Sequence, residues 1–192
     1  MTFIIDGNIG SGKSTLLKKI KELHPEKEII LENIHVFKTW LDLFYQDMEK
    51  YSLGFQMEVL MSHMKHKKHP NFGDNKLIIE RSPLSCLHVF GLNLVESGNL
   101  SKEENNLCMR INMEFGWLPK KIIYIETDPK ICFGRIQERN REGESSISLD
   151  YLQKIHVLYQ KIYQNSKQLK VFIIDGNQSA DKVYQEVLEI IR

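Results

Sequence analysis

The chain alternates between short apolar runs and longer stretches whose apolar residues recur at helical spacing. The apolar runs are TFIID at 2–6, EIIL at 28–31, KLIIE at 76–80, KIIYIE at 121–126 and KVFIID at 170–175. Continuous apolar runs of this length are typical of strands that are buried on both faces of a parallel sheet. The pattern therefore predicts an α/β fold with a five-stranded, mainly parallel sheet flanked by helices.

Two kinds of signal stand where predicted strands end: helix N-cap residues followed by proline, and charged or polar residues directly after a strand. Ser82 precedes Pro83, and Thr127-Asp128 precede Pro129, which is the pattern of an N-cap followed by proline in the first turn. Right-handed crossovers place the carboxyl ends of parallel strands at one edge, where ligands bind in such folds. Glu32 and the triplet ERS at 80–82 follow strands, so we expect them at that edge.

The stretch GNIGSGKST at 7–15 fits the phosphate-loop pattern and stands between a predicted strand and a predicted helix. Glycines let the backbone point its N–H groups at an anion, and a helix beginning near Lys13 adds the positive end of its dipole. A turn that only joins strand to helix is the alternative, but full spacing in the right context rarely arises by chance. The predicted phosphate-binding residues are Gly7, Asn8, Ile9, Gly10, Ser11, Gly12, Lys13, Ser14 and Thr15. Lys13 would reach the β- and γ-phosphates, and the Ser14 hydroxyl would hold Mg²⁺.

Composition narrows the class of protein. A chain of 192 residues is most simply one domain, and 26 basic against 25 acidic residues give a net charge of +1, which indicates neither nucleic acid nor membrane as a partner. Cys86, Cys108 and Cys132 lack CxxC spacing and are interpreted as reduced, buried thiols. The chain enters its first strand without a charged leader, and no apolar run approaches the ~20 residues of a membrane span. We therefore expect a cytoplasmic protein with a small-molecule partner.

An arginine-rich stretch follows the fourth predicted strand. Arg135 and Arg139 are four residues apart on one helix face, and Arg141 lies just beyond. Three guanidinium groups can converge on phosphate, so we predict a lid at about residues 135–145. The alternative is a solvated helix end in which Glu138 and Glu142 pair with these arginines.

Two sequence features argue against a GTPase and against a motor ATPase. It has no Asn-Lys-x-Asp motif, which a GTPase needs to recognise its base. Its third strand ends in Glu80, where a motor ATPase would have aspartate. These features favour phosphoryl transfer to a small acceptor.

Taken in order, the motifs resemble those of the deoxynucleoside kinase family, which includes deoxycytidine, deoxyguanosine and mitochondrial thymidine kinases and, more distantly, herpesvirus thymidine kinases. The resemblance covers nearly the whole chain. It rests on GNIGSGKST, Glu32, YSLGFQ at 51–56, ERS at 80–82, RxxxRxRxxE from Arg135 to Glu144, and LDYLQKIH at 149–156. It implies a P-loop kinase fold, a single deoxynucleoside kinase domain over residues 1–192, ATP as phosphate donor and Mg²⁺ as cofactor. It also implies a homodimer formed through the helices that start near Pro83 and Leu149.

The resemblance assigns roles by position. Glu32 is implied to be the general base for the 5′-hydroxyl. Arg81 is implied to hold Glu32 and the 5′-oxygen in line with the γ-phosphate, and Glu80 is implied to bind Mg²⁺. Gln56 is implied to pair with the base edge and Phe90 to stack on it. The other implied substrate contacts are Tyr45 and Glu144 to the 3′-hydroxyl, and Phe37, Val59, His63 and Cys86 around the base; Arg135, Arg139 and Arg141 would bind the donor phosphates.

Base preference is a finer expectation. The family pairs an arginine with an aspartate where this chain has Val59, His63 and Cys86, and the smaller side chains leave room for a methyl group. We therefore expect pyrimidines to be favoured, thymidine first and deoxycytidine second.

Three alternatives concern sites and function. His63, His66 and His69 could suggest a metal, but they run into a Lys-rich helix end, and a solvated basic face is favoured. A nucleoside monophosphate kinase of the thymidylate kinase type would share the loop and the lid, but would need extra cations in its acceptor pocket. A non-catalytic nucleotide-binding regulatory module is the third possibility.

Overall fold

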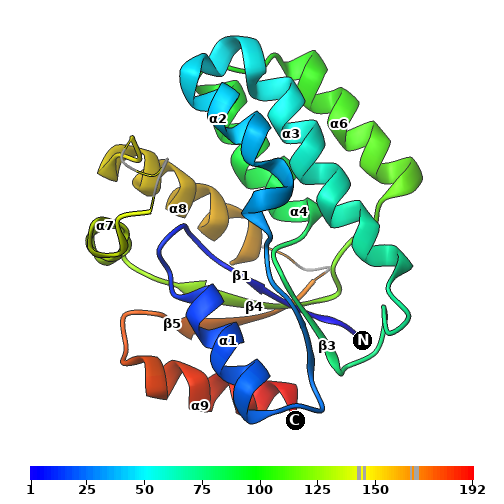
Figure 1. The fold of residues 1–192 in the computed structure, drawn as a ribbon, viewed down its shortest axis with the longest axis vertical. Helices are drawn as coiled ribbons and strands as arrows, with labels where there is room; N and C mark the ends of the chain where they lie inside the picture. Colours follow the sequence, from blue (N-terminus) through cyan, green and yellow to red (C-terminus); the bar gives the residue numbers. More distant parts are fainter. Residues whose placement is uncertain (142–143, 145, 165, 167–168) are drawn as a thin grey trace. The chain divides into compact units, whose positions relative to one another are not determined.

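The computed structural model describes residues 1–141, 144, 146–164, 166 and 169–192. The chain forms two compact units, which are described separately (Figure 1). The sheet unit comprises Met1–Glu32, Asn71–Arg81 and Pro119–Arg192, and the helical unit comprises Asn33–Pro70 and Ser82–Leu118. A single domain over residues 1–192 stays a prediction. Residues 142, 143 and 145 of the predicted lid lie outside the described residues.

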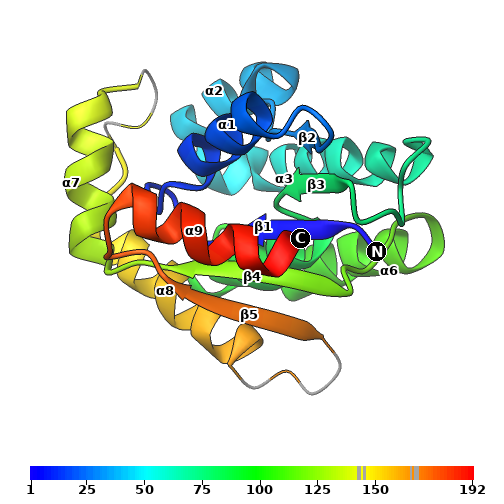
Figure 2. The same ribbon diagram turned by 90° about the horizontal axis from the view of Figure 1, so that it is seen from below.

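The sheet unit contains the predicted five-stranded parallel sheet, in the order β2-β3-β1-β4-β5 (Figure 2). The strands are β1 Phe3–Asp6, β2 Glu28–Ile30, β3 Leu77–Glu80, β4 Lys121–Glu126 and β5 Lys170–Asp175. Each lies within a predicted apolar run, so the predicted fold class is confirmed. Ile5 of β1 stands opposite Glu80 of β3, and Asp6 stands opposite Tyr124 of β4. This register brings the ends of three strands to the start of the phosphate loop.

Helices cover both faces of this sheet within the unit. They are α1 Lys13–Leu23, α7 Pro129–Arg139, α8 Leu149–Tyr163 and α9 Ala180–Ile191. Helices α1 and α9 pack on the face that presents Phe3 and Ile5 of β1, in one hydrophobic core (Figure 2). Because side chains alternate along a strand, Asp6 and Tyr124 point to the opposite face. There Tyr124 stacks on Tyr159 of α8, with ring centroids 5.5 Å apart.

The helical unit is built around α3 Met48–Met64. Its other elements are η1 Ile34–Phe37, α2 Lys38–Gln46, η2 Lys65–Lys68, α4 Pro83–Ser85, η3 Cys86–Gly91, α5 Leu92–Glu96 and α6 Lys102–Phe115. A helix begins at Pro83 as predicted, but η3 is a π-helix, whose wider turn interrupts the regular helix. All three cysteines are free and buried, which confirms the interpretation of buried thiols.

The prediction of a solvated basic face at the histidines is wrong for His63. This side chain is only 2% exposed, because α3 buries the face that carries Gln56, Leu60 and His63 at helical spacing. Burial and the neighbouring His63 and His69 lower the pKa of His66 to about 4, so its imidazole is neutral at pH 7. The face is therefore less basic than the sequence suggests.

No helix in the described part of the chain combines the length and apolar character needed to cross a bilayer.

Candidate active site

The stretch from Gly7 to Thr15 forms a loop between β1 and α1, as predicted. Gly10 and Gly12 have φ values of 80° and 97°, in the left-handed region that side chains disfavour. A Cβ on Gly10 would also lie 2.5 Å from the Cys132 carbonyl oxygen. These two positions therefore require glycine, and α1 begins immediately after them at Lys13. The loop and the helix N-terminus together form the geometry of an anion site.

Lys13 is held inside this loop. Its Nζ donates hydrogen bonds to the Asn8 carbonyl oxygen at 2.6 Å and to Ser11 Oγ at 3.3 Å. Burial, together with the nearby Arg81, lowers the pKa of Lys13 to about 8, against the opposing effect of the surrounding carboxylates. A bound polyphosphate would stabilise the charged amine, since opposite charge favours the ionised form.

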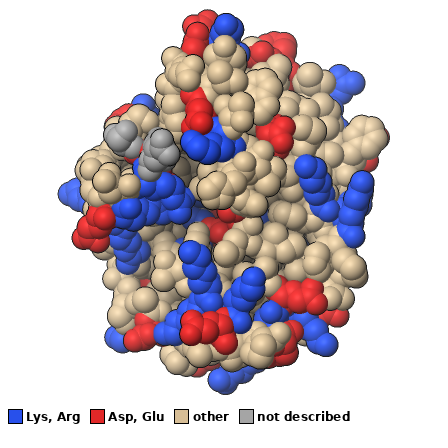
Figure 3. All heavy atoms as spheres, viewed as in Figure 1, with Lys and Arg blue, Asp and Glu red and all other residues tan. Residues whose placement is uncertain are grey.

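A pocket of about 490 Å³ opens beside the loop. Its lining comes from the phosphate loop, α1, β4, α7, the segment after β5 and the start of α9. The lining residues are Gly10, Ser11, Gly12, Lys13, Ser14, Thr15, Leu16, Lys19, Ile125, Arg135, Glu138, Arg139, Gly176, Gln178, Ala180 and Val183. Arg135 spans its wall, because its Nη1 donates to the Ser11 carbonyl at 3.4 Å and its Nη2 to the Gly176 carbonyl at 3.3 Å. Figure 3 shows Lys and Arg side chains gathered over α7. The pocket thus joins the loop to the cationic helix that was predicted to cover phosphate.

The polar residues at the strand ends meet around Glu80. Its Oε1 accepts from Ser14 Oγ at 2.6 Å, and its Oε2 accepts from the backbone N–H of Glu32 at 3.2 Å. Arg81 Nε donates to Glu32 Oε2 at 2.9 Å. The four residues predicted to carry metal binding and proton transfer therefore lie together at one edge of the sheet.

The lid arginines are arranged differently from one another. Arg139 makes a bidentate pair with Glu144, with both hydrogen bonds at 2.7 Å, and Arg141 Nη1 lies 3.4 Å from the same carboxylate. Glu144 was predicted to bind the 3′-hydroxyl, and here its two oxygens hold the lid arginines. Arg135 and Arg139 both line the pocket. Within the described residues, Arg139 pairs with Glu144, whereas Arg135 contacts backbone carbonyls of the pocket wall.

The residues predicted to surround the base belong to the helical unit. Gln56 is 3% exposed on α3, and the Cys86 thiol donates to its Oε1 at 3.2 Å. Val59 and Phe90 are half-buried, while the Phe37 ring lies edge-on to Phe55 at 6.0 Å. Tyr45 is half-buried and tilted against Phe44, with ring centroids 5.5 Å apart. The thiol–amide contact links α3 to η3 and sets the orientation of the one amide that was predicted to recognise a base.

Sequence reasoning missed a buried cluster behind Arg81. The Asp6 carboxylate accepts from Tyr159 Oη at 2.7 Å and from Tyr163 Oη at 2.8 Å. Arg81 Nη1 donates to Tyr159 Oη at 2.6 Å. Two signals pointed to this cluster: Asp6 is a charged residue at the end of a fully apolar strand, and the tyrosines are four apart on one helix face.

Burial and neighbouring charged groups determine the protonation states of Arg81, Tyr159 and Tyr163. Burial lowers the pKa of Arg81, but Tyr159, Glu32 and Asp6 raise it well above its usual value, so the guanidinium remains charged. Burial raises the pKa of both Tyr159 and Tyr163, so both hydroxyls keep their protons and can donate to Asp6. The cluster is therefore a charged pair network with neutral phenols as hydrogen-bond donors.

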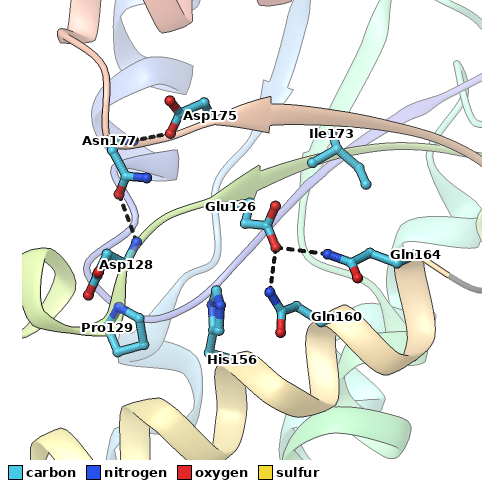
Figure 4. A pocket seen from close by; sticks show the side chains of 9 residues that line it. All are labelled: Glu126, Asp128, Pro129, His156, Gln160, Gln164, Ile173, Asp175 and Asn177. Carbon is cyan, nitrogen blue, oxygen red and sulfur yellow. Dashed lines mark hydrogen bonds between the residues drawn. The ribbon is translucent and has the colours of Figure 1, made fainter.

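A second pocket, of about 470 Å³, lies between α8 and the ends of β4 and β5 (Figure 4). Its carboxylates are already engaged. Glu126 Oε1 accepts from Gln160 and Gln164, and Asp175 accepts from the backbone N–H of Asn177. An acidic lining disfavours a polyphosphate, so the pocket beside the phosphate loop is the better candidate for binding one.

Comparison with known proteins places this geometry in a family. The family model described as "Deoxynucleoside kinase" matches residues 3–192. The protein 029R of Invertebrate iridescent virus 3 is 34% identical over 188 residues, covering 97% of this chain and 94% of that protein. Deoxycytidine kinase 2 of Gallus gallus is 28% identical over 230 residues, covering 96% of this chain and 86% of that protein. The solved deoxyadenosine kinase from M. mycoides has the same fold, with a TM-score of 0.87, 22% identity, and coverage of 100% of this chain and 98% of that one.

The chain belongs to the deoxynucleoside kinase family, and the predicted family is confirmed. It is therefore a kinase that phosphorylates a nucleoside.

Proposed function

We propose that the protein transfers the γ-phosphoryl group of ATP, with Mg²⁺, to the 5′-hydroxyl of a deoxynucleoside. The observation that carries the proposal is the hydrogen bond from Arg81 Nε to Glu32, beside the Ser14–Glu80 pair at the end of the phosphate loop. A neutral hydroxyl needs a base to take its proton as it attacks phosphorus. Glu32 supplies a carboxylate at the place where the loop would hold the phosphates.

Each residue of the sheet unit has a distinct part in this proposal. Glu32 accepts the proton of the 5′-hydroxyl through a carboxylate that Arg81 keeps in one orientation. The loop N–H groups and Lys13 bind the phosphates, and Arg135 covers them from α7. Binding of the phosphates would draw Lys13 Nζ from the loop oxygens that it contacts in the free protein.

The oxygen donors near the loop fit Mg²⁺. This ion prefers oxygen ligands and usually keeps several waters, so it needs only one or two protein groups beside the nucleotide. The Ser14 hydroxyl and the Glu80 carboxylate are adjacent and are of this kind. Across the described residues, no group of three or more His, Cys, Asp or Glu side chains is placed to hold an ion by itself. When bound, Mg²⁺ would neutralise charge on the transferred phosphoryl group.

The acceptor residues favour a nucleoside over a nucleoside monophosphate. The 5′ end of the acceptor would lie beside the carboxylates of Glu32 and Glu80, and the neighbouring Arg81 already donates to Glu32. A monophosphate acceptor would bring two negative charges that require cations. A regulatory module without catalysis would have no use for the Glu32–Arg81 pair.

One assay tests the function. ATP and Mg²⁺ are supplied with each of the four deoxynucleosides, and in parallel with each of the four deoxynucleoside monophosphates. We expect product from at least one deoxynucleoside and little from any monophosphate. Faster transfer to a monophosphate would favour the thymidylate kinase type, and no transfer to any acceptor would favour the regulatory module.

Glu32→Gln tests the base. The amide keeps the shape and the hydrogen bond from Arg81 but cannot take a proton, so we expect kcat to fall by about 10²–10⁴-fold. Deoxynucleoside binding, measured by calorimetry, should change little. Glu22→Gln, an exposed substitution on α1, is the matched control and should leave kcat unaltered. Near wild-type turnover by the Glu32 variant would remove Glu32 from this role.

Base preference follows from the Gln56–Cys86 contact. The relatives are named for different bases, so we argue preference from the residues implied to surround the base. The thiol is a small, weak donor that orients the amide and leaves room for the thymine methyl, which is worth about 1–3 kcal/mol in an apolar pocket. We therefore propose thymidine first, deoxycytidine second and purines last.

The test ranks kcat/KM for the four deoxynucleosides, in the wild type and in Cys86→Asp. A buried carboxylate would accept from an exocyclic amine, so the variant should lose preference for thymidine relative to deoxycytidine. Cys108→Asp, which changes another buried thiol of the helical unit, controls for general damage. A purine deoxynucleoside ranked first in the wild type would contradict the proposed pocket.

We also propose a homodimer, on the family resemblance alone. A dimer of 22.6 kDa chains would sediment at twice that mass at micromolar concentration. A species with the mass of one chain at the same concentration would count against it.

A further inference from the structure

The cluster behind Arg81 contains a carboxylate that the proposed chemistry does not use. Asp6 is fully buried, and each of its oxygens accepts from a tyrosine hydroxyl; Oδ1 also accepts from the backbone N–H of Gly7 at 2.8 Å. Arg81 Nη1 lies 3.6 Å from the same Oδ1. A buried charge needs partners, and Asp6 has them on three sides. The carboxylate thereby connects the first residue of the phosphate loop to α8.

Tyr159 occupies the position between Asp6 and Arg81. Its hydroxyl donates to Asp6 and accepts from Arg81, so one oxygen takes part in two short hydrogen bonds. The ring is fixed by stacking on Tyr124 and by complete burial. Tyr163 donates to the other oxygen of Asp6 from the next turn of α8. The two tyrosines therefore share a carboxylate, but the described bond to Arg81 belongs to Tyr159.

The backbone of Arg81 is constrained as well as its side chain. Its φ is 64°, which is rare for a residue other than glycine, and its N–H donates to the Ile5 carbonyl at 3.0 Å. The two ends of the guanidinium are held separately, Nε by Glu32 and Nη1 by Tyr159. Loss of the second contact would remove the hydroxyl that holds Nη1 in place beside Asp6.

We propose that Tyr159 is a positioning residue for phosphoryl transfer, which sets the guanidinium of Arg81 and through it the carboxylate of Glu32. The inference rests on the proposed function, since it assigns Tyr159 to the same reaction. Tyr159 touches no reacting atom in this account. Its effect on turnover passes through Arg81 alone.

Tyr159→Phe and Tyr163→Phe form a matched pair of test variants. Each removes one hydroxyl that donates to Asp6, but only the first removes a hydroxyl that is described as accepting from Arg81 Nη1. We expect Tyr159→Phe to lower kcat by about 10- to 100-fold, with a KM for the nucleoside within about threefold of wild type. A misplaced catalytic group slows phosphoryl transfer more than it weakens nucleoside binding. Tyr163→Phe should lower kcat by about threefold at most. Thermal unfolding of both variants measures the structural loss that they share.

The Glu32→Gln background separates positioning from general damage. If Tyr159 acts through Arg81 on Glu32, Tyr159→Phe should cost little further activity once Glu32 can no longer accept a proton. An equal fold-loss in both backgrounds would overturn the proposal, as would equal kcat values for the two tyrosine variants.

The comparison uses whichever acceptor the wild type phosphorylates best. Transfer to a monophosphate alone would overturn the proposed function, while the difference between the two tyrosine variants would still test the role of Tyr159.

Discussion

The sheet unit depends on a buried arginine whose charge must be matched on every side. Arg81 follows β3 directly, has a left-handed backbone, and contacts Glu32, Tyr159 and Asp6. Removing one partner of a buried ion pair typically costs about 3–5 kcal/mol, whereas keeping all partners contributes little net stability. Such a cluster is therefore better understood as a device for fixing geometry than as a source of stability.

The parallel sheet explains why these residues meet. Alternation along β1 sends Phe3 and Ile5 into the core under α1 and α9, and sends Asp6 to the face covered by α8. Pairing of β1 with β3 puts Ile5 opposite Glu80, one residue before Arg81. The phosphate loop begins directly after Asp6, so the same strand end supplies both the anion site and the counter-ion of Arg81. One edge of the sheet thus brings together the residues proposed for phosphate binding, the residue proposed for proton transfer and the buried carboxylate beside Arg81.

Much of this edge could be predicted from the sequence because its determinants are local. Continuous apolar runs predicted all five strands, and the glycine spacing predicted the loop and the start of α1 at Lys13. Glu32, Glu80 and Arg81 were predicted at the edge because they follow strands. The roles of these residues, and of Gln56 and Phe90, came from the family resemblance and stay predictions.

What could not be predicted depends on contacts distant in sequence. The hydrogen bond between Tyr159 and Asp6 joins residues 153 positions apart, and no local pattern reports such a contact. The burial of His63 was missed because a histidine beside lysines is usually solvated, while here the buried face of α3 continues as far as that residue. The pairing of Glu144 with the lid arginines was missed for a related reason: the motif names the residues but not which of them pair in the free protein.

The central claim is that the buried cluster holds Glu32 at the oxygen that attacks phosphorus. A crystal structure of the protein with a deoxynucleoside and a non-hydrolysable ATP analogue tests this directly. The account predicts the 5′-oxygen within hydrogen-bond distance of the Glu32 carboxylate, with Arg81 still bonded to both Glu32 and Tyr159. A 5′-oxygen placed against another side chain, or an Arg81 that has left Tyr159, would contradict it.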